Sequence, residues 1–191
     1  MRPRREPHQA MLCDRVLGNV GSDATGRYAG RPRDALELTW RECARRAVRG
    51  RTANGLSVGI LLPPGAHLRH GDVIADDDAA GLVVVAVSPC EVWVADFADA
   101  AALATAALEL GNLHVPVEVA CPLRLMTPPD GPSRGVLDRL AAAWRAETRR
   151  FQPLRATVSA GGLRVAESFK VMRPGSGAVA APPPQLMNNR E

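Results

Sequence analysis

His114 is the residue of this chain whose position most suggests chemistry. The chain has only four histidines, and this one stands in the stretch GNLHVPVEV, where a predicted helix gives way to a predicted strand. A neutral imidazole is a common ligand of divalent transition metals. A single histidine is nevertheless more often a packing or surface residue, so the rest of the chain has to decide between the two interpretations.

Two more histidines, His67 and His70, stand three residues apart in HLRHGD, with Asp72 close behind. On a helix this spacing would place both imidazoles on one face, where a carboxylate could add an oxygen ligand. The neighbouring PPG and GD sequences favour a turn instead, so we predict at most a weaker second metal site. His8, in the N-terminal segment, could fold back as a supplementary ligand.

The other reactive groups show no arrangement typical of catalysis. The acidic run Asp76 to Asp78 could hold a hard cation, but such turns are usually only solvated. There is no Gly-x-x-x-x-Gly-Lys loop for a nucleotide and no paired acid and base, so we predict that the protein is not an enzyme. Without C-x-x-C spacing the cysteines indicate buried thiols rather than a zinc ribbon or a disulfide framework: Cys13, Cys43, Cys90 and Cys121.

Composition bounds the remaining possibilities. The 191 residues suffice for two small domains. The net charge of +4 comes from arginine, with Lys170 as the single lysine, and arginine can simply reflect genomic base composition, so it is weak support for a nucleic-acid partner. No apolar run approaches the roughly 20 residues that a membrane span needs. We therefore expect a cytoplasmic protein without a membrane partner.

Residues 11–90 predict a β domain. DALELTW alternates, with Leu36, Leu38 and Trp40 on one face, and the apolar stretches LSVGILL and GLVVVAVS are typical of further strands. Short strands separated by regular turns favour a small barrel or sandwich.

The segment RECARRAVRGR, residues 41–51, is ambiguous between helix and strand. We favour a strand, because its neighbours are strands and the segment ends near Gly50. Its arginines could form a phosphate-binding stripe, but a charged strand face that prevents edge-to-edge pairing is the simpler account. The five are Arg41, Arg45, Arg46, Arg49 and Arg51.

Residues 91–172 predict a ferredoxin-like domain, so the fold class is α+β. A strand in EVWVADF precedes a helix that begins after Asp99 and ends just before Gly111. Strands in HVPVEVA and LRLMT, a second helix from Ser133, and a last strand in LRATVSA complete the order β-α-β-β-α-β. The predicted core face of the first helix is Leu103, Ala106, Ala107 and Leu110; that of the second is Val136, Leu137, Leu140, Ala141 and Trp144. The ends, residues 1–10 and 173–191, are predicted to be disordered.

With these elements placed, the chain resembles the UreE family of urease accessory proteins, which are nickel-delivery metallochaperones. The similarity rests on LELTWRECARRAVRGRTANGLSVGILLPPGAHLRHGDVI, on the strands through EVWVADF, and above all on LELGNLHVPVEV. The resemblance spans residues 12–155, and its most specific item is Gly111-Asn112-x-His114-x-Pro116 between a helix and a strand.

The resemblance implies a homodimer in which His114 of both subunits binds Ni(II), with Gly111, Asn112 and Pro116 shaping the site. A two-fold axis would double the imidazoles available to one metal, and Zn(II) or Cu(II) could also bind in vitro. An imidazole must be neutral to bind, so affinity should fall on acidification. The implied partners are the urease accessory GTPase and the urease apoprotein with its other accessory proteins, contacted through the N-terminal β domain.

Two departures from the family pattern are visible. Residues 173–191 contain no histidine, where many members have a histidine-rich tail, so we expect one metal per dimer. Leu113 stands where the family usually has arginine. Two alternatives stay open: a nucleic-acid-binding module that uses a ferredoxin-like sheet and the arginine-rich segment, although only 4% of residues are aromatic; and a scaffold of the urease assembly complex that carries no metal.

Overall fold

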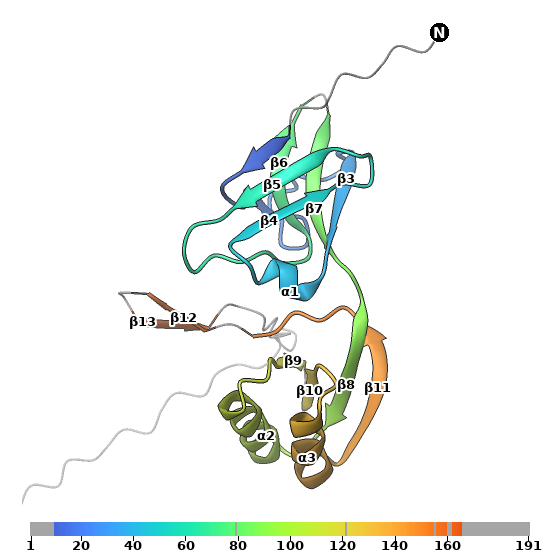
Figure 1. Ribbon diagram of the computed structural model, residues 1–191, viewed down its shortest axis with the longest axis vertical. Coiled ribbons are helices and arrows are strands. Elements are labelled where there is room, and N and C mark those ends of the chain that lie inside the picture. The colour runs from blue at the N-terminus through green and yellow to red at the C-terminus, as the bar shows by residue number, and fades with distance from the viewer. Residues whose placement is uncertain (1–9, 79, 121, 155, 160–161, 166–191) are drawn as a thin grey trace, which may run out of the picture.

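The computed structural model describes residues 10–78, 80–120, 122–154, 156–159 and 162–165 (Figure 1). His8, Cys121 and the predicted disordered ends therefore lie outside the described residues, except for Ala10. No helix in the described part of the chain is long and apolar enough to cross a membrane. Figure 1 shows a β-rich unit from the first half of the chain, followed by a unit with two helices against a sheet.

The first unit is a sandwich of two sheets. One sheet has the order β1 (Met11–Cys13), β5 (Ser57–Leu61), β4 (Ala47–Arg51), and the other has the order β2 (Gly18–Asn19), β6 (Asp72–Asp77), β7 (Gly81–Val87), β3 (Arg33–Leu38). The apolar side chains between them form one cluster that includes Leu36, Val58 and Val85. The predicted sandwich is confirmed, and the two sheets do not close into a barrel.

The expected strand over residues 41–51 is wrong in its first part. Residues Trp40–Cys43 form a short helix, α1, and the strand β4 begins only at Ala47. Thr39 caps this helix: its side chain accepts from the Glu42 N–H, while the Glu42 carboxylate accepts from the Thr39 N–H at 2.8 Å. This capping box stabilises a helix start, and its Thr-x-x-Glu spacing is visible in the sequence. Trp40 thus leaves the strand face to which the alternation assigned it.

The second unit has the ferredoxin-like strand order. Its four-stranded antiparallel sheet runs β11 (Ala143–Arg149), β8 (Cys90–Asp96), β10 (Arg124–Thr127), β9 (Glu118–Ala120). The predicted class is confirmed, but the last strand is wrong: it is β11, not LRATVSA. Residues 156–159 instead form β12 (Ala156–Ser159), which pairs with β13 (Gly162–Val165) in a separate hairpin.

Two helices, α2 (Ala100–Asn112) and α3 (Gly131–Leu140), pack on this sheet. Asp99 caps α2 as predicted, and all four residues predicted for its core face belong to one cluster with α3 and the sheet. Helix α3 begins earlier than predicted, with Asp130 as its N-cap, and ends at Leu140. Trp144 therefore lies on β11 rather than on the helix, although it still packs into the same cluster.

The segment after β11 joins the two units, as Figure 1 shows. Phe151 is fully buried and meets Trp40 of α1 edge to face, with 5.2 Å between the ring centroids. Gln152 bridges both units: its side-chain oxygen accepts from the His70 N–H at 2.9 Å, and its own N–H donates to the Glu118 carboxylate at 2.5 Å. Residues 150–154, the junction strap, therefore link the His70 loop to strand β9.

Candidate metal centre

His114 follows the last turn of α2 and has a left-handed backbone. Its φ is +57°, and it is the one residue other than glycine with positive φ among those that the structure describes. A side chain in this region costs of order 1 kcal/mol, although histidine tolerates it better than most residues. Such strain persists only where surrounding contacts impose it, and it is frequent at functional sites.

The surrounding contacts form a Schellman motif. The His114 N–H donates to the Gly111 carbonyl at 3.0 Å, and the Val115 N–H donates to the Leu110 carbonyl at 2.9 Å. Val115 and Leu110 are both buried in the core beneath the helix end, which supplies the apolar contact that accompanies this motif. The helix end therefore holds His114 in the position usually occupied by glycine.

The predicted end of this helix, just before Gly111, is wrong, because α2 continues to Asn112. Gly111 lies inside α2 rather than past its end, and its φ is not positive. A Cβ at Gly111 would meet nothing within 4 Å. Gly111 contributes its carbonyl to the turn. Asn112 is the last helical residue, and the Asn112 side chain makes no hydrogen bond to the described residues.

The segment after His114 is held by hydrogen bonds from strand β10 and from the junction strap. The Pro116 carbonyl accepts from the Thr127 hydroxyl of β10 at 3.2 Å, and the Val117 carbonyl accepts from the Leu154 N–H at 2.7 Å. Proline also fixes its own φ, which limits the freedom of the turn. His114 thus sits between a rigid helix end and an anchored segment, so its Cα position is well defined.

The His114 side chain is exposed, and its imidazole makes no hydrogen bond within the described part of the chain. No group of three or more His, Cys, Asp or Glu residues that could hold a metal ion occurs among the described residues. The described part of one chain therefore offers an available imidazole but not a complete site. The donor set fits a metal only if further ligands come from solvent or from a second protein molecule.

The surface beside His114 is uncharged. The exposed residues of α2 are Ala100, Ala101, Ala104, Thr105, Leu108, Gly111 and Asn112. Leu108 is 65% exposed, and Leu113, just past the helix, is 49% exposed. The one charged residue of α2, Glu109, is turned toward α3, where it pairs with Arg139. Small residues with one protruding leucine suit close packing against another helix.

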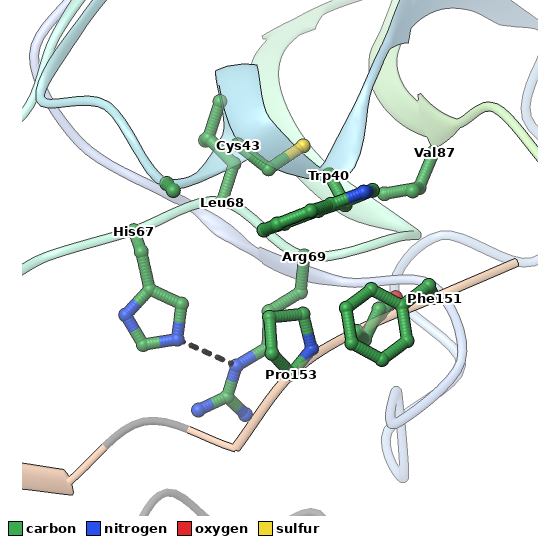
Figure 2. A pocket seen from close by; sticks show the side chains of 10 residues that line it. Trp40, Cys43, His67, Leu68, Arg69, Val87, Phe151 and Pro153 are labelled. Carbon is green, nitrogen blue, oxygen red and sulfur yellow. Dashed lines mark hydrogen bonds between the residues drawn. The ribbon is translucent and has the colours of Figure 1, made fainter. Parts of the chain in front are cut away.

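His67 and His70 lie in the loop between β5 and β6 and have other partners. The ring of His67 accepts from the Arg69 guanidinium at 3.4 Å, beside a cavity of about 30 Å³ at the domain junction (Figure 2). The Nδ1 atom of His70 accepts from the Val87 N–H at 3.3 Å. Burial, followed by the charge of Arg150, lowers the pKa of His70. These contacts give His70 a structural role.

Asp72 is committed to the same loop. One carboxylate oxygen accepts from the Asn19 amide at 2.9 Å and the other from the Arg69 N–H at 2.7 Å. Burial raises the pKa of Asp72, and these hydrogen bonds act in the opposite direction. The structure does not bring His67, His70 and Asp72 together as a three-ligand group among the described residues.

The acidic turn is paired with arginine. Asp76 forms ion pairs with Arg31 at 2.6 Å and Arg27 at 3.0 Å, and Arg31 also reaches Asp78 at 3.7 Å. Two guanidinium groups thus stand where a cation would otherwise be attracted.

The five arginines of residues 41–51 do not form one stripe. Arg41 stacks on Trp40, with 4.5 Å from its guanidinium carbon to the ring centroid, and Arg46 donates to the Leu62 carbonyl at 2.7 Å. Arg49 and Arg51 are exposed on β4, which is an edge strand of its sheet. This placement agrees with the charged edge that the sequence favoured.

The cysteines are buried or half-buried where described. Cys13 and Cys43 are buried, as predicted, and Cys90 is half-buried. Burial raises the pKa of Cys13, and the charge of Asp14 adds to that effect; burial also raises the pKa of Cys90. Because the thiolate is the form that binds metals and attacks electrophiles, these two thiols are poorly suited to either role.

A Gly-x-Ser-x-Gly motif stands at the start of α3. GPSRG, residues 131–135, has the Gly-x-Ser-x-Gly spacing of a hydrolase nucleophile. The structure places Ser133 inside the first turn of α3, fully buried, with its hydroxyl 3.5 Å from that of Thr127. A substrate cannot reach this hydroxyl, so the spacing has no catalytic meaning here.

Comparisons with known proteins match both units. A family model described as UreE urease accessory protein, N-terminal domain, matches residues 13–87, and one described as UreE urease accessory protein, C-terminal domain, matches residues 90–168. A protein of Nostoc punctiforme named urease accessory protein UreE is 35% identical over 144 residues, which cover 75% of this chain and 92% of that protein. A protein of the same name from another Nostoc species is 36% identical over 118 residues, or 62% of this chain and 80% of the relative.

Proposed function

Because the chain belongs to the UreE family of urease accessory proteins, we propose that it binds one Ni(II) ion between the His114 side chains of two protomers. It delivers this ion for assembly of the urease metal centre. Nickel is cargo rather than a resident cofactor, and transfer is ligand exchange, so the protein acts without catalysing a reaction of its own.

The observation that carries this proposal is the strained and exposed position of His114. The Schellman motif would be easier to form with glycine, yet it carries a histidine with a solvent-facing ring. Folding alone gives no reason for a histidine at this position. A metal ligand does give one, because its side chain must project into solvent from a fixed point. The imidazole has no competing hydrogen bond among the described residues, so a metal can take it without breaking a contact.

The missing ligands are best supplied by symmetry. One imidazole binds a divalent metal weakly, but a two-fold axis through the region of His114 places a second, identical ring opposite the first. The uncharged face of α2 supports this arrangement, because it lies beside His114 and offers Leu108 as a protruding apolar contact. Water completes the coordination and exchanges during transfer. Zn(II) and Cu(II) compete for the same nitrogens in vitro, and Cu(II) binds such ligands more tightly.

The partners of this dimer are the urease accessory GTPase and the urease apoprotein with its other accessory proteins, in the cytoplasm. The N-terminal sandwich contacts such partners, while the ferredoxin-like unit holds the metal. The arginines that would favour a nucleic-acid partner are dispersed, and Arg41, Arg46 and Arg51 have partners within the protein.

The test is calorimetric titration of Ni(II) into the wild-type chain and into His114→Asn, with the molar mass of each measured by light scattering. Asparagine accepts the left-handed backbone without an imidazole, so this variant keeps the helix end while removing the ligand. The wild type should bind about half an equivalent per chain, as a ligand shared across a two-fold axis requires. His114→Asn should stay folded and lose this binding.

The matched control is the double variant His67→Asn with His70→Asn, which removes the weaker candidate site. It should bind nickel as the wild type does. Equal binding by His114→Asn and the wild type would contradict the proposal and make His67 and His70, or a scaffold without metal, the leading alternatives. Several strong sites per dimer would contradict the shared-ligand stoichiometry.

A further inference from the structure

The outer face of the sheet β1-β5-β4 carries an exposed apolar strip, which consists of Leu12, Gly59 and Leu61. Leu12 pairs with Gly59, and Gly59 pairs with Arg49, so these three residues form one row across the three strands. Leu61 lies two residues further along β5 and so points to the same face. Leu12 is 77% exposed and Leu61 is 49% exposed. Two large side chains are thus held in solvent on a regular sheet, away from His114.

The strip is hollowed. Two adjoining grooves, of about 660 and 380 Å³, share Leu12, Arg49 and Gly59 in their walls and floor. A Cβ on Gly59 would meet Leu12 Cδ1 at 3.5 Å, an ordinary contact, and the φ of Gly59 is not positive. Neither crowding nor backbone conformation requires glycine here. Its effect is to leave space in the floor of the groove between a leucine and an arginine.

Positive charge lines one side of the strip. Arg49 and Arg51 project from β4, and neither forms an ion pair with any residue that the structure describes. Arg51 makes one hydrogen bond, to the Gly55 carbonyl at 3.3 Å. Guanidinium groups that have no carboxylate partner within the described residues favour the carboxylates of a binding partner.

We propose that this groove, lined by Leu12, Gly59, Leu61, Arg49 and Arg51, binds an extended acidic segment of a partner protein. Apolar side chains of that segment fill the space above Gly59, and its carboxylates pair with the arginines of β4. This inference rests on the proposed role of the N-terminal sandwich in partner contact, not on nickel binding. A single-stranded nucleic acid fits the groove less well, because no aromatic side chain lines it for base stacking.

The experiment measures fluorescence polarisation of two labelled peptides with the full chain. One is built from leucine and glutamate, and the other has lysine in place of glutamate. The acidic peptide should bind the wild type and the basic one at least about tenfold more weakly, given like charges across the contact. Gly59→Val fills the floor of the groove, and Arg49→Glu reverses the charge of its wall. Each variant should therefore bind the acidic peptide about tenfold or more weakly than the wild type.

The decisive variant combines Arg49→Glu with Arg51→Glu, which should reverse the preference so that the basic peptide binds better. Arg33→Glu, an exposed site on β3 of the other sheet, is the charge-matched control and should bind like the wild type. Equal affinity for both peptides, or unchanged binding by the groove variants, would overturn the proposal. So would a labelled oligothymidine that binds in preference to the acidic peptide and is lost with the same variants.

Nickel titration of the groove variants separates this inference from the proposed function. These variants should take up nickel as the wild type does, because the groove lies in the other unit from His114. Loss of peptide binding with intact nickel uptake supports the groove, whatever the fate of the nickel proposal. A simultaneous loss of nickel uptake would contradict the separation of the two sites.

Discussion

His114, and not Gly111, holds the left-handed position that ends helix α2. The pattern Gly111-Asn112 predicts that glycine takes the left-handed position that ends the helix, because glycine is common there. The structure gives that position to His114 and keeps Gly111 helical. Spacing alone cannot separate the two, because the choice depends on Val115 and Leu110, whose burial in the core fixes where the helix ends.

This backbone strain leads to a stability prediction. His114→Gly should raise the free energy of unfolding by about 1 kcal/mol, because glycine adopts positive φ without a steric cost. His114→Ala should give little or no gain, since alanine keeps the Cβ that causes the strain. Urea unfolding of the three proteins without metal measures the difference. If glycine and alanine have the same effect, the left-handed conformation does not contribute to stability as proposed.

His70 gives a prediction about pH. Burial and the charge of Arg150 lower its pKa in the folded protein, so the folded state binds this proton less readily than the unfolded chain. The resulting stability is fully present above the unfolded pKa and is lost as the pH falls toward the folded pKa. His70→Asn can still accept from the Val87 N–H but does not titrate. Its stability should therefore decline less than that of the wild type when the pH falls below about 6.5.

The measurement is urea unfolding of both proteins at a series of pH values. Burial raises the pKa of Glu118, which contacts the same strap through Gln152. This carboxyl therefore favours the folded state at acidic pH. Because the two effects oppose each other in the wild type, only the comparison with His70→Asn isolates the contribution of His70. Parallel curves for the two proteins would show that His70 does not carry the dependence.

At the scale of elements, the sequence predicts a strand or helix where its residues show a clear alternation or a capping residue. Alternation predicts β3, and the Asp99 cap predicts the start of α2. The last strand is misplaced because β11 has the charged sequence AWRAETR, whose exposed face hides its pairing. Trp144 fits the helical spacing of α3, yet it reaches the same core from a strand. Sequence spacing says that the residue faces the core but not which element carries it.

The junction strap gives a prediction for the elements that it joins. Gln152→Ala removes the acceptor of the His70 N–H, which leaves a half-buried donor without that partner and should cost about 1 kcal/mol. The loss is local to the junction, because Phe151 stays buried against Trp40. Hydrogen exchange should show faster exchange of the His70 amide, while amides of β7 and α2 stay protected. Gln152→Glu keeps an acceptor and serves as the control; equal exchange in both variants would argue against the contact.

At the scale of the whole molecule, α2 carries a signal that the core prediction left unused. Its sequence AAALATAALELGN is apolar or small on nearly every face, whereas a helix at a protein surface usually has one polar side. The core of one chain accounts for Ala106 and Leu110 but not for Leu108 or the alanines beside it. The proposed dimer would cover this face with a second copy of the chain, but one chain's sequence cannot specify how two copies meet.

A dimer that shares its metal must couple assembly to nickel. If Ni(II) binds only where two His114 rings meet, it stabilises the dimer over the monomer by mass action. Sedimentation of dilute protein should therefore show more dimer when nickel is added, and His114→Asn should abolish this shift without changing the metal-free equilibrium. Leu108→Glu places a charge in the uncharged face and should weaken the dimer by at least about tenfold.

Leu113→Arg is the matched control for that charge, because a long arginine can keep its guanidinium in solvent from the rim of the contact. It should leave the dimer intact and change nickel affinity only modestly. A variant Leu108→Glu that is monomeric yet binds a full equivalent of nickel per chain would separate metal binding from assembly. Each His114 would then act without its counterpart, and the two-fold axis would lose its chemical role.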